Sequence, residues 1–319
     1  MTPIGGYFEL ELQQGKSAYH DTPYALKSGR SSLGCILEAV RPSLVYLPYY
    51  TCNGLLEPLE LAGVPYRFYK IDSNLEPTTL PELKQNEYLL YINYFDAKGA
   101  LVQQLSDVYA QQLIVDCTQA FFRKGNGRSW FFNSCRKFFG VPDGSFLYAP
   151  EGISVAPVSS SNNQFLVDHL LSRFNGDVAG GYPFFLQNEL LCGGAVDGMS
   201  KLTTYLLSHV NYEEVAEKRR ANFGHLHQSF KELNLLPIGL CDDAVPMYYP
   251  LWLKKPIERD ALYAQNLFIP TFWKDVPARG MKSFETEVDL TNQLYPIPVD
   301  HRYTIEDMYQ IIRIINALL

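Results

Sequence analysis

Lys137 is the residue of this 319-residue sequence whose surroundings point most directly to chemistry. It follows Asn133-Ser134-Cys135-Arg136, precedes Gly140-Val141-Pro142-Asp143-Gly144, and has four phenylalanines close by in sequence, Phe131, Phe132, Phe138 and Phe139. Lysine is strongly hydrated and rarely buried, so this aromatic setting predicts a desolvated amine. Desolvation favours the uncharged amine, which is nucleophilic near neutral pH. Upstream, Leu113-Ile114-Val115 predicts a buried strand that ends in Asp116.

A nucleophilic amine and a carboxylate at a strand end are what the cofactor pyridoxal 5'-phosphate (PLP) requires. The amine holds the cofactor as an imine, and the carboxylate keeps the pyridine nitrogen protonated so that the ring accepts electrons. The cofactor phosphate needs N–H donors, which the N-terminus of a helix supplies. Gly29-Arg30-Ser31-Ser32 opens a predicted helix with apolar residues at helical spacing, Leu33, Ile36, Leu37 and Val40. The sequence therefore supplies all three groups.

Strands and helices alternate around these residues. Apolar runs predict strands at 44–47, 64–69, 88–94, 112–115 and 145–148, and helical spacing predicts helices at 54–62, 101–111, 165–174, 199–210 and 212–233. This alternation is typical of an α/β fold with a mostly parallel sheet. The charges of 212–233, Arg219 and Arg220 among them, predict a solvated helix face.

The pattern changes near residue 235 to short apolar segments interrupted by prolines. Strands are expected at 247–253 and 293–299, and a last helix begins with Thr304 as N-cap and Asp307 at the third position. We therefore expect a large PLP-binding domain over 1–234, which includes the N-terminal segment, and a small α+β domain over 235–319.

The composition excludes several other classes. The formal net charge of -7 argues against a nucleic-acid binder, and no apolar stretch is long enough to span a membrane. The N-terminus lacks the basic and then apolar pattern of a secretion signal. The six cysteines form no Cys-x-x-Cys pair and no zinc-like cluster, so we expect free thiols, no metal site and a cytoplasmic location.

Taken together, the motifs resemble those of the DegT/StrS-type sugar aminotransferases, a branch of the fold-type I PLP-dependent enzymes. Gly29-Arg30-Ser31 matches the family's phosphate-binding run, and Asp116-Cys117-Thr118-Gln119 matches its Asp-x-x-Gln motif. Lys137 with Asp143-Gly144 matches its lysine followed by an acidic residue and glycine. The resemblance covers most of residues 25–319.

The resemblance implies a fold and a role for each matching residue. The large domain would hold a seven-stranded-type sheet, and two copies would form a homodimer with active sites at the interface. Lys137 would bind PLP, Asp116 would face the pyridine nitrogen, and Gln119 would lie near the ring hydroxyl. The phosphate would contact Gly29, Arg30 and Ser31.

The sequence also departs from the family pattern. The aromatic residue that stacks on the ring in the family falls near Cys52, so Tyr50 or Tyr49 is expected to take that role, and Cys52 is expected among the cofactor contacts. Arg30 replaces a threonine, and a guanidinium pairs well with phosphate. Val196-Asp197-Gly198-Met199 replaces an asparagine-arginine pair that precedes a helix.

Two residues keep two interpretations each. Ser134 is either a phosphate ligand or a loop hydroxyl, and Asn93 either faces the substrate or stabilises a turn.

The reaction that the resemblance implies is transfer of an amino group from a glutamate-like amino acid to a keto-sugar or related carbonyl compound. The alternatives are elimination or dehydration at a sugar carbon, and a PLP-fold protein that has lost catalysis and serves as a binding partner.

Overall fold

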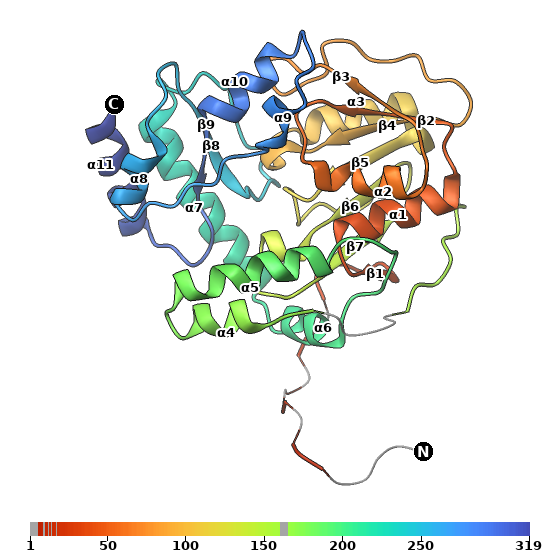
Figure 1. Ribbon diagram of the computed structural model, residues 1–319, viewed down its shortest axis with the longest axis horizontal. Coiled ribbons are helices and arrows are strands. Elements are labelled where there is room, and N and C mark those ends of the chain that lie inside the picture. Colours follow the sequence, from red (N-terminus) through yellow and green to blue (C-terminus); the bar gives the residue numbers. More distant parts are fainter. Residues whose placement is uncertain (1–5, 9, 12, 14, 17, 160–164) are drawn as a thin grey trace.

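The computed structural model describes residues 6–8, 10, 11, 13, 15, 16, 18–159 and 165–319. They form a seven-stranded sheet flanked by helices and a separate two-stranded sheet (Figure 1). The strand order in the large sheet is β1-β7-β6-β5-β4-β2-β3. Strands β3, β2, β4, β5 and β6 are parallel, and β7 pairs antiparallel with both β6 and β1, so β7 runs opposite to the other strands of this sheet. The predicted α/β class with a mostly parallel sheet is confirmed.

The strands of the large sheet are short and mostly buried. Their bounds are β1 Tyr24–Leu26, β2 Leu44–Pro48, β3 Tyr66–Tyr69, β4 Glu87–Ile92, β5 Leu113–Cys117, β6 Trp130–Asn133 and β7 Ser145–Tyr148. All residues of β4, β5 and β6 are buried, as expected for central parallel strands covered on both faces.

The helices that accompany this sheet are α1 Gly29–Val40, α2 Glu57–Leu61, α3 Gly99–Tyr109, α4 Asp168–Phe174, α5 Val178–Leu191, α6 Lys201–Ser208 and α7 Tyr212–Phe230. Of these helices, α1, α5, α6 and α7 begin at a side-chain cap. Ser28 caps α1, where its side chain accepts a hydrogen bond from the Ser31 N–H. In Figure 1, α4, α5 and α6 lie together beneath the large sheet.

The C-terminal part is built on an antiparallel pair, β8 (Tyr248–Trp252) and β9 (Leu294–Pro298). Its helices are α8 Arg259–Ala264, α9 Asp275–Ala278, α10 Glu285–Gln293 and α11 Ile305–Leu318. Thr304 and Asp307 form the expected capping box at α11. One hydrophobic core joins both sheets, since Leu90 and Tyr249 belong to the same buried cluster. The boundary after residue 234 remains a prediction.

Several local predictions were wrong or incomplete. Strands β1 and β6 and helix α5 were not predicted, because two strands are short and aromatic and α5 contains Pro183 with no amphipathic spacing. The predicted strand 88–94 ends at Ile92, after which the chain turns. Arg219 is buried rather than solvated, because its guanidinium donates to the carbonyls of Pro246, Met247 and Phe138.

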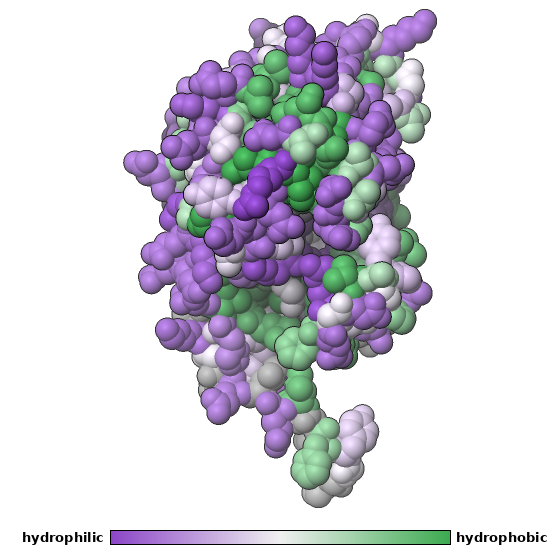
Figure 2. All heavy atoms as spheres, turned by 90° about the vertical axis from the view of Figure 1, so that its left-hand side faces the viewer, coloured by the Kyte–Doolittle hydropathy of each residue, from purple (hydrophilic) through white to green (hydrophobic). Residues whose placement is uncertain are grey.

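Figure 2 shows the side of the molecule that carries the C-terminal helices, where hydrophilic side chains dominate and apolar groups lie between them. Among the described residues, no helix has the length and apolarity that a membrane crossing requires.

Candidate active site

Four parallel strands end at the same edge of the large sheet. The residues that follow them are 49–53 after β2, 93–96 after β4, 118–119 after β5 and 134–137 after β6. In the sheet register, Asp116 lies between Ile92 of β4 and Phe132 of β6. Ligands of open α/β sheets bind at this carboxyl-terminal edge, so the sequence-predicted residues meet where a site is expected.

Lys137, Thr118 and Asp116 form a connected polar group at this edge. The Lys137 Nζ donates a 3.0 Å hydrogen bond to Thr118 Oγ1, and the Thr118 N–H donates a 2.7 Å bond to Asp116 Oδ1. Burial raises the pKa of Asp116, whereas the charge of Lys137 and hydrogen bonds from the Thr118 backbone and side chain lower it. The lysine and the carboxylate thus interact through one threonine.

The start of α1 approaches the same threonine closely. A Cβ at Gly29 would lie 3.2 Å from Thr118 Cγ2 and 3.5 Å from the Asn133 carbonyl oxygen, so a larger residue would crowd this contact. The first N–H groups of a helix have no partner within the helix and attract anions. An amine, a buried carboxylate and a helix N-terminus therefore converge on Thr118.

Gln119 lies beside this group and is buried. Its Oε1 accepts a 2.9 Å hydrogen bond from the Phe95 N–H, which fixes the side-chain amide. Asn93 serves the turn after β4 instead, since its Oδ1 accepts from the Lys98 N–H and its Nδ2 donates to Asp96. Of the two interpretations of Asn93, the contacts favour the turn.

The loop that carries Lys137 is held closed at its two ends. Lys137 belongs to a 3₁₀ helix, Cys135–Lys137, and the Cys135 N–H donates to the Gly144 carbonyl over 2.9 Å. Gly144 has a φ of +115°, where a Cβ would also collide with Thr203 and Cys135. Asp143 accepts hydrogen bonds from Ser200 and Thr203, so it fixes the start of α6.

The expected desolvation of Lys137 by its phenylalanine neighbours was wrong for the single chain. Lys137 is exposed, whereas Phe138 and Phe139 are buried in a cluster with Phe121 and Phe122. Consecutive residues of a tight helix face different directions, so neighbours in sequence do not surround one another.

Arg30 is occupied by protein partners. Its Nη1 donates to Glu57 over 2.9 Å and its Nη2 to the Glu189 carbonyl over 2.7 Å. The Glu189 carboxylate also contacts Arg136, the residue before Lys137. Arg30 thus joins the start of α1 to α2 and α5, and this pairing engages the guanidinium that was expected to bind phosphate.

The other candidate residues occupy different depths. Ser31 is buried and its Oγ donates to the Ala195 carbonyl, while Ser134 is half-buried at the start of the Cys135–Lys137 helix. Tyr50 is fully buried against Tyr94 and Trp273. Tyr49 is fully buried as well, whereas Cys52 is half-buried, so Cys52 is the most accessible of the three residues expected near the ring.

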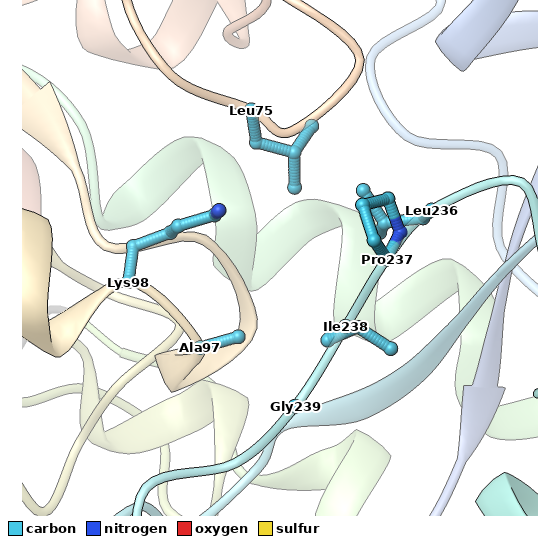
Figure 3. A pocket seen from close by; sticks show the side chains of 7 residues that line it. All are labelled: Leu75, Ala97, Lys98, Leu236, Pro237, Ile238 and Gly239. Carbon is cyan, nitrogen blue, oxygen red and sulfur yellow. The ribbon is translucent and has the colours of Figure 1, made fainter.

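Figure 3 shows a small hollow at a different place, lined by Leu75, Ala97, Lys98 and residues 236–239. Its volume of about 10 Å³ is no larger than one water molecule requires. The Lys98 Nζ is already paired with Glu76 at 2.8 Å. This hollow cannot hold a cofactor, and the candidate site lies at the sheet edge instead.

Thr118 is the site residue that sequence reasoning missed. It occupies the third position of the Asp-x-x-Gln motif, and its hydroxyl connects the lysine with the carboxylate. The sequence signal for this role was a hydroxyl residue placed between the two motif residues Asp116 and Gln119.

The comparisons identify the fold. No family model matches the sequence, and a search of curated proteins finds no match. Among solved structures, the chain is similar to aminotransferase TlmJ from Streptoalloteichus hindustanus, with 15% identity, a TM-score of 0.63, and coverage of 92% of this chain and 84% of that one. Sugar aminotransferase CalS13 from Micromonospora echinospora has 13% sequence identity and a TM-score of 0.60, and the match covers 92% of this chain and 86% of that one. A DegT DnrJ EryC1 StrS aminotransferase from Brucella abortus has 14% sequence identity and a TM-score of 0.60, and the match covers 92% of this chain and 85% of that one. The chain therefore has the fold of these aminotransferases, the same family that its motifs resemble.

Proposed function

We propose that this protein is a PLP-dependent aminotransferase that moves an amino group from a glutamate-like amino acid to a keto-sugar or related carbonyl compound. The observation that carries the proposal is the contact of the Lys137 amine with Thr118, directly beside the buried carboxylate of Asp116. A similar protein from Streptococcus pneumoniae, with 12% identity and a TM-score of 0.59, is described in its PLP form.

The residues at the sheet edge fit this cofactor. Burial raises the pKa of Asp116, and a protonated pyridine nitrogen would supply the positive partner that a buried carboxylate needs. Gly29 lets the start of α1, whose N–H groups would hold the phosphate, approach Thr118 closely, and Gln119, with its amide fixed by Phe95, would face the ring hydroxyl. When bound, PLP supplies an electron sink for a substrate carbanion.

The residues of this chain would then divide the work. Lys137 would hold the cofactor and, once released, would move a proton at the substrate carbon through its Nζ. Thr118 would orient that nitrogen through the bond already present. Asp116 would keep the pyridine nitrogen protonated, and the start of α1 would bind the phosphate.

We also propose a homodimer in which the partner helps to cover the site. The exposure of Lys137 supports this assembly, because proton transfer by an amine is favoured where water is excluded. A cytoplasmic location agrees with the six unpaired cysteines. We place the PLP-binding domain at 1–234 and the small domain at 235–319.

Reduction with borohydride tests the role of Lys137. Protein mixed with PLP should show the visible absorbance of lysine-bound cofactor, and mass spectrometry after reduction should find the adduct on Lys137. In the Lys137→Ala variant both signals should disappear. An unchanged signal in that variant would refute the assignment of this lysine.

Incubation with glutamate tests the reaction class. An aminotransferase releases 2-oxoglutarate in a first half-reaction without any acceptor. If PLP binds at Lys137 but glutamate yields no 2-oxoglutarate, the dehydration or elimination alternative replaces transamination. If the wild type binds no PLP, the protein is a binding partner with an inherited fold.

A further inference from the structure

The turn 49–53 after β2 carries Cys52, the half-buried candidate for contact with the cofactor ring. Residues at a strand end leave carbonyl groups that require donors. Within this turn, the Thr51 N–H donates to the Tyr49 carbonyl over 2.9 Å. The further partners of the turn come from a distant segment, 273–281, which contains α9.

Arg279 supplies most of these bonds. Its Nη1 donates to the Tyr49 carbonyl over 2.5 Å, and its Nη2 donates to the Thr51 carbonyl over 2.7 Å and to Asn53 Oδ1 over 2.9 Å. The guanidinium also lies 5.3 Å from the ring centre of Tyr49 and 5.2 Å from that of Phe68. Burial lowers the pKa of Arg279.

The same two segments meet at further points. Asp275 Oδ2 accepts a 2.9 Å bond from the Asn53 N–H, and the Tyr49 hydroxyl donates over 3.1 Å to the Val276 carbonyl. The ring of Trp273 meets the ring of Tyr50 edge-on at 4.5 Å. Figure 1 shows α9 between the two-stranded sheet and β3, in line with these contacts.

We propose that Arg279 is a positioning residue that fixes the turn 49–53 and, through it, the placement of Cys52 at the cofactor ring. Thr51 and Asn53, the residues on either side of Cys52, are both bound by the same guanidinium. The part of this statement that concerns the ring rests on the proposed function. The part that concerns the turn rests on the contacts alone.

Arginine is required here for a geometric reason. Its planar guanidinium reaches three acceptors at once and stacks on aromatic rings, whereas the ammonium of lysine is a compact, strongly hydrated charge. Lysine at position 279 would keep the charge and lose the simultaneous bonds. The turn would then open more often, and the Cys52 thiol would become more accessible.

The reaction rate of the Cys52 thiol with a small chromogenic disulfide measures this opening. Cys241 is exposed, and the cysteines other than Cys52 and Cys241 are buried, so a Cys241→Ser background leaves Cys52 as the accessible thiol. In that background, Arg279→Lys should raise the Cys52 rate about tenfold, the factor that about one lost hydrogen bond to a charged group gives. Arg313→Lys, on the exposed face of α11, is the matched control and should leave the rate unchanged.

Two further measurements connect the turn with the ring. PLP should slow the modification of Cys52 in the parent protein and less so in Arg279→Lys. The visible circular dichroism of bound PLP, which reports on asymmetry around the ring, should weaken in Arg279→Lys while the absorbance persists. Asp275→Asn weakens one bond to the turn, so it should raise the reaction rate of Cys52 by a smaller factor than Arg279→Lys does. This variant replaces Arg279→Lys in the test if that protein does not fold.

The outcomes separate this inference from the proposed function. If the parent binds PLP at Lys137 but neither Arg279→Lys nor Asp275→Asn changes the Cys52 rate, the positioning role is refuted and the proposed function stands. If the parent binds no PLP, the proposed function fails, and a faster Cys52 reaction in the variants still supports the fixed turn. An equal increase in Arg313→Lys would also refute a specific role of Arg279.

Discussion

Lys137 and Phe138 are neighbours in the chain but lie in opposite environments. The Lys137 side chain is exposed at the sheet edge and bonds to Thr118, whereas Phe138 is 3% exposed and packs behind the loop. The guanidinium of Arg219 lies 4.5 Å from the Phe138 ring centre, and Phe121 lies at 5.7 Å. The two faces of this loop therefore separate the chemistry of the site from the packing that holds it.

The packed face extends well beyond the loop. Phe138 belongs to a buried cluster with Phe121 and Phe139, and the His20 ring meets Phe121 and Phe146 at 4.6 and 4.7 Å. Residues from three distant parts of the sequence thus fix the backbone from which Lys137 reaches Thr118. Substitutions on the two faces should change different properties of the protein.

The largest effect is expected on the exposed face, in Lys137→Arg. Arginine keeps the positive charge but stays protonated, so it cannot act as nucleophile or base. Activity with glutamate should fall by at least about 10²–10⁴-fold, the usual contribution of acid–base catalysis. Thermal unfolding without PLP should change by no more than about 0.5 kcal/mol, as for most exposed positions. The exposed Lys255→Arg is the control, and full activity in Lys137→Arg would refute the division of the two faces.

On the packed face, Phe138→Ala should mainly reduce stability. Removal of a buried phenylalanine ring costs about 3–5 kcal/mol, through lost burial and the cavity that remains. Urea unfolding of the cofactor-free protein measures this loss. Phe174→Ala, at a residue that is 90% exposed, should change the free energy of unfolding by no more than about 0.5 kcal/mol. Equal effects at the two positions would contradict the packing described for Phe138.

His20 should make the packed face sensitive to acid. Burial, with a contribution from Lys124, lowers the pKa of His20 to about 3. The neutral ring is bonded to Phe121 and Tyr148. The neutral His20 ring therefore stabilises the folded protein fully above the ordinary pKa of 6.5. This contribution to the free energy of unfolding is lost progressively as the pH falls from 6.5 towards 3. Between pH 7.5 and pH 5 the loss is about 2 kcal/mol.

The His20→Gln variant isolates this contribution, because it removes the titrating ring. Chemical denaturation at pH 7.5 and pH 5 should show a smaller pH dependence in this variant than in the wild type. His209→Gln, at an exposed position, should retain the dependence of the wild type. A pH dependence that is the same in all three proteins would show that His20 is not held neutral by burial.

The features of the fold and the site that depend on local sequence patterns could be predicted. The helix start at Gly29, the strand that carries Asp116 and the order of the motifs depend on local spacing, so they were predictable. That these residues meet follows from the parallel sheet, whose strands end at one edge. The capping box of Thr304 and Asp307 was predictable for the same local reason.

Features that depend on distant contacts were not predictable. The phenylalanines near Lys137 gave no indication of which side of the loop each would face, and β6 was hidden in the same aromatic run. Arg219 sits in a charged helix, yet its burial depends on carbonyl groups more than twenty residues away in sequence. The partners of Arg30 likewise come from α2 and α5, which local patterns do not connect.

The smallest expected effect concerns Thr118, which accepts the hydrogen bond from Lys137 on the exposed face. Thr118→Val keeps a methyl group against Gly29 and removes the hydroxyl that bonds to Lys137 and lowers the pKa of Asp116. Stability should change by about 1 kcal/mol or less, and activity should fall by about tenfold or less, as for one hydrogen bond. Because the Asp116 pKa rises further without the hydroxyl, the acidic limb of the pH–rate profile should move to higher pH. Thr118→Ser restores the hydroxyl and should restore the profile, whereas a profile unchanged in Thr118→Val would show that the threonine only packs.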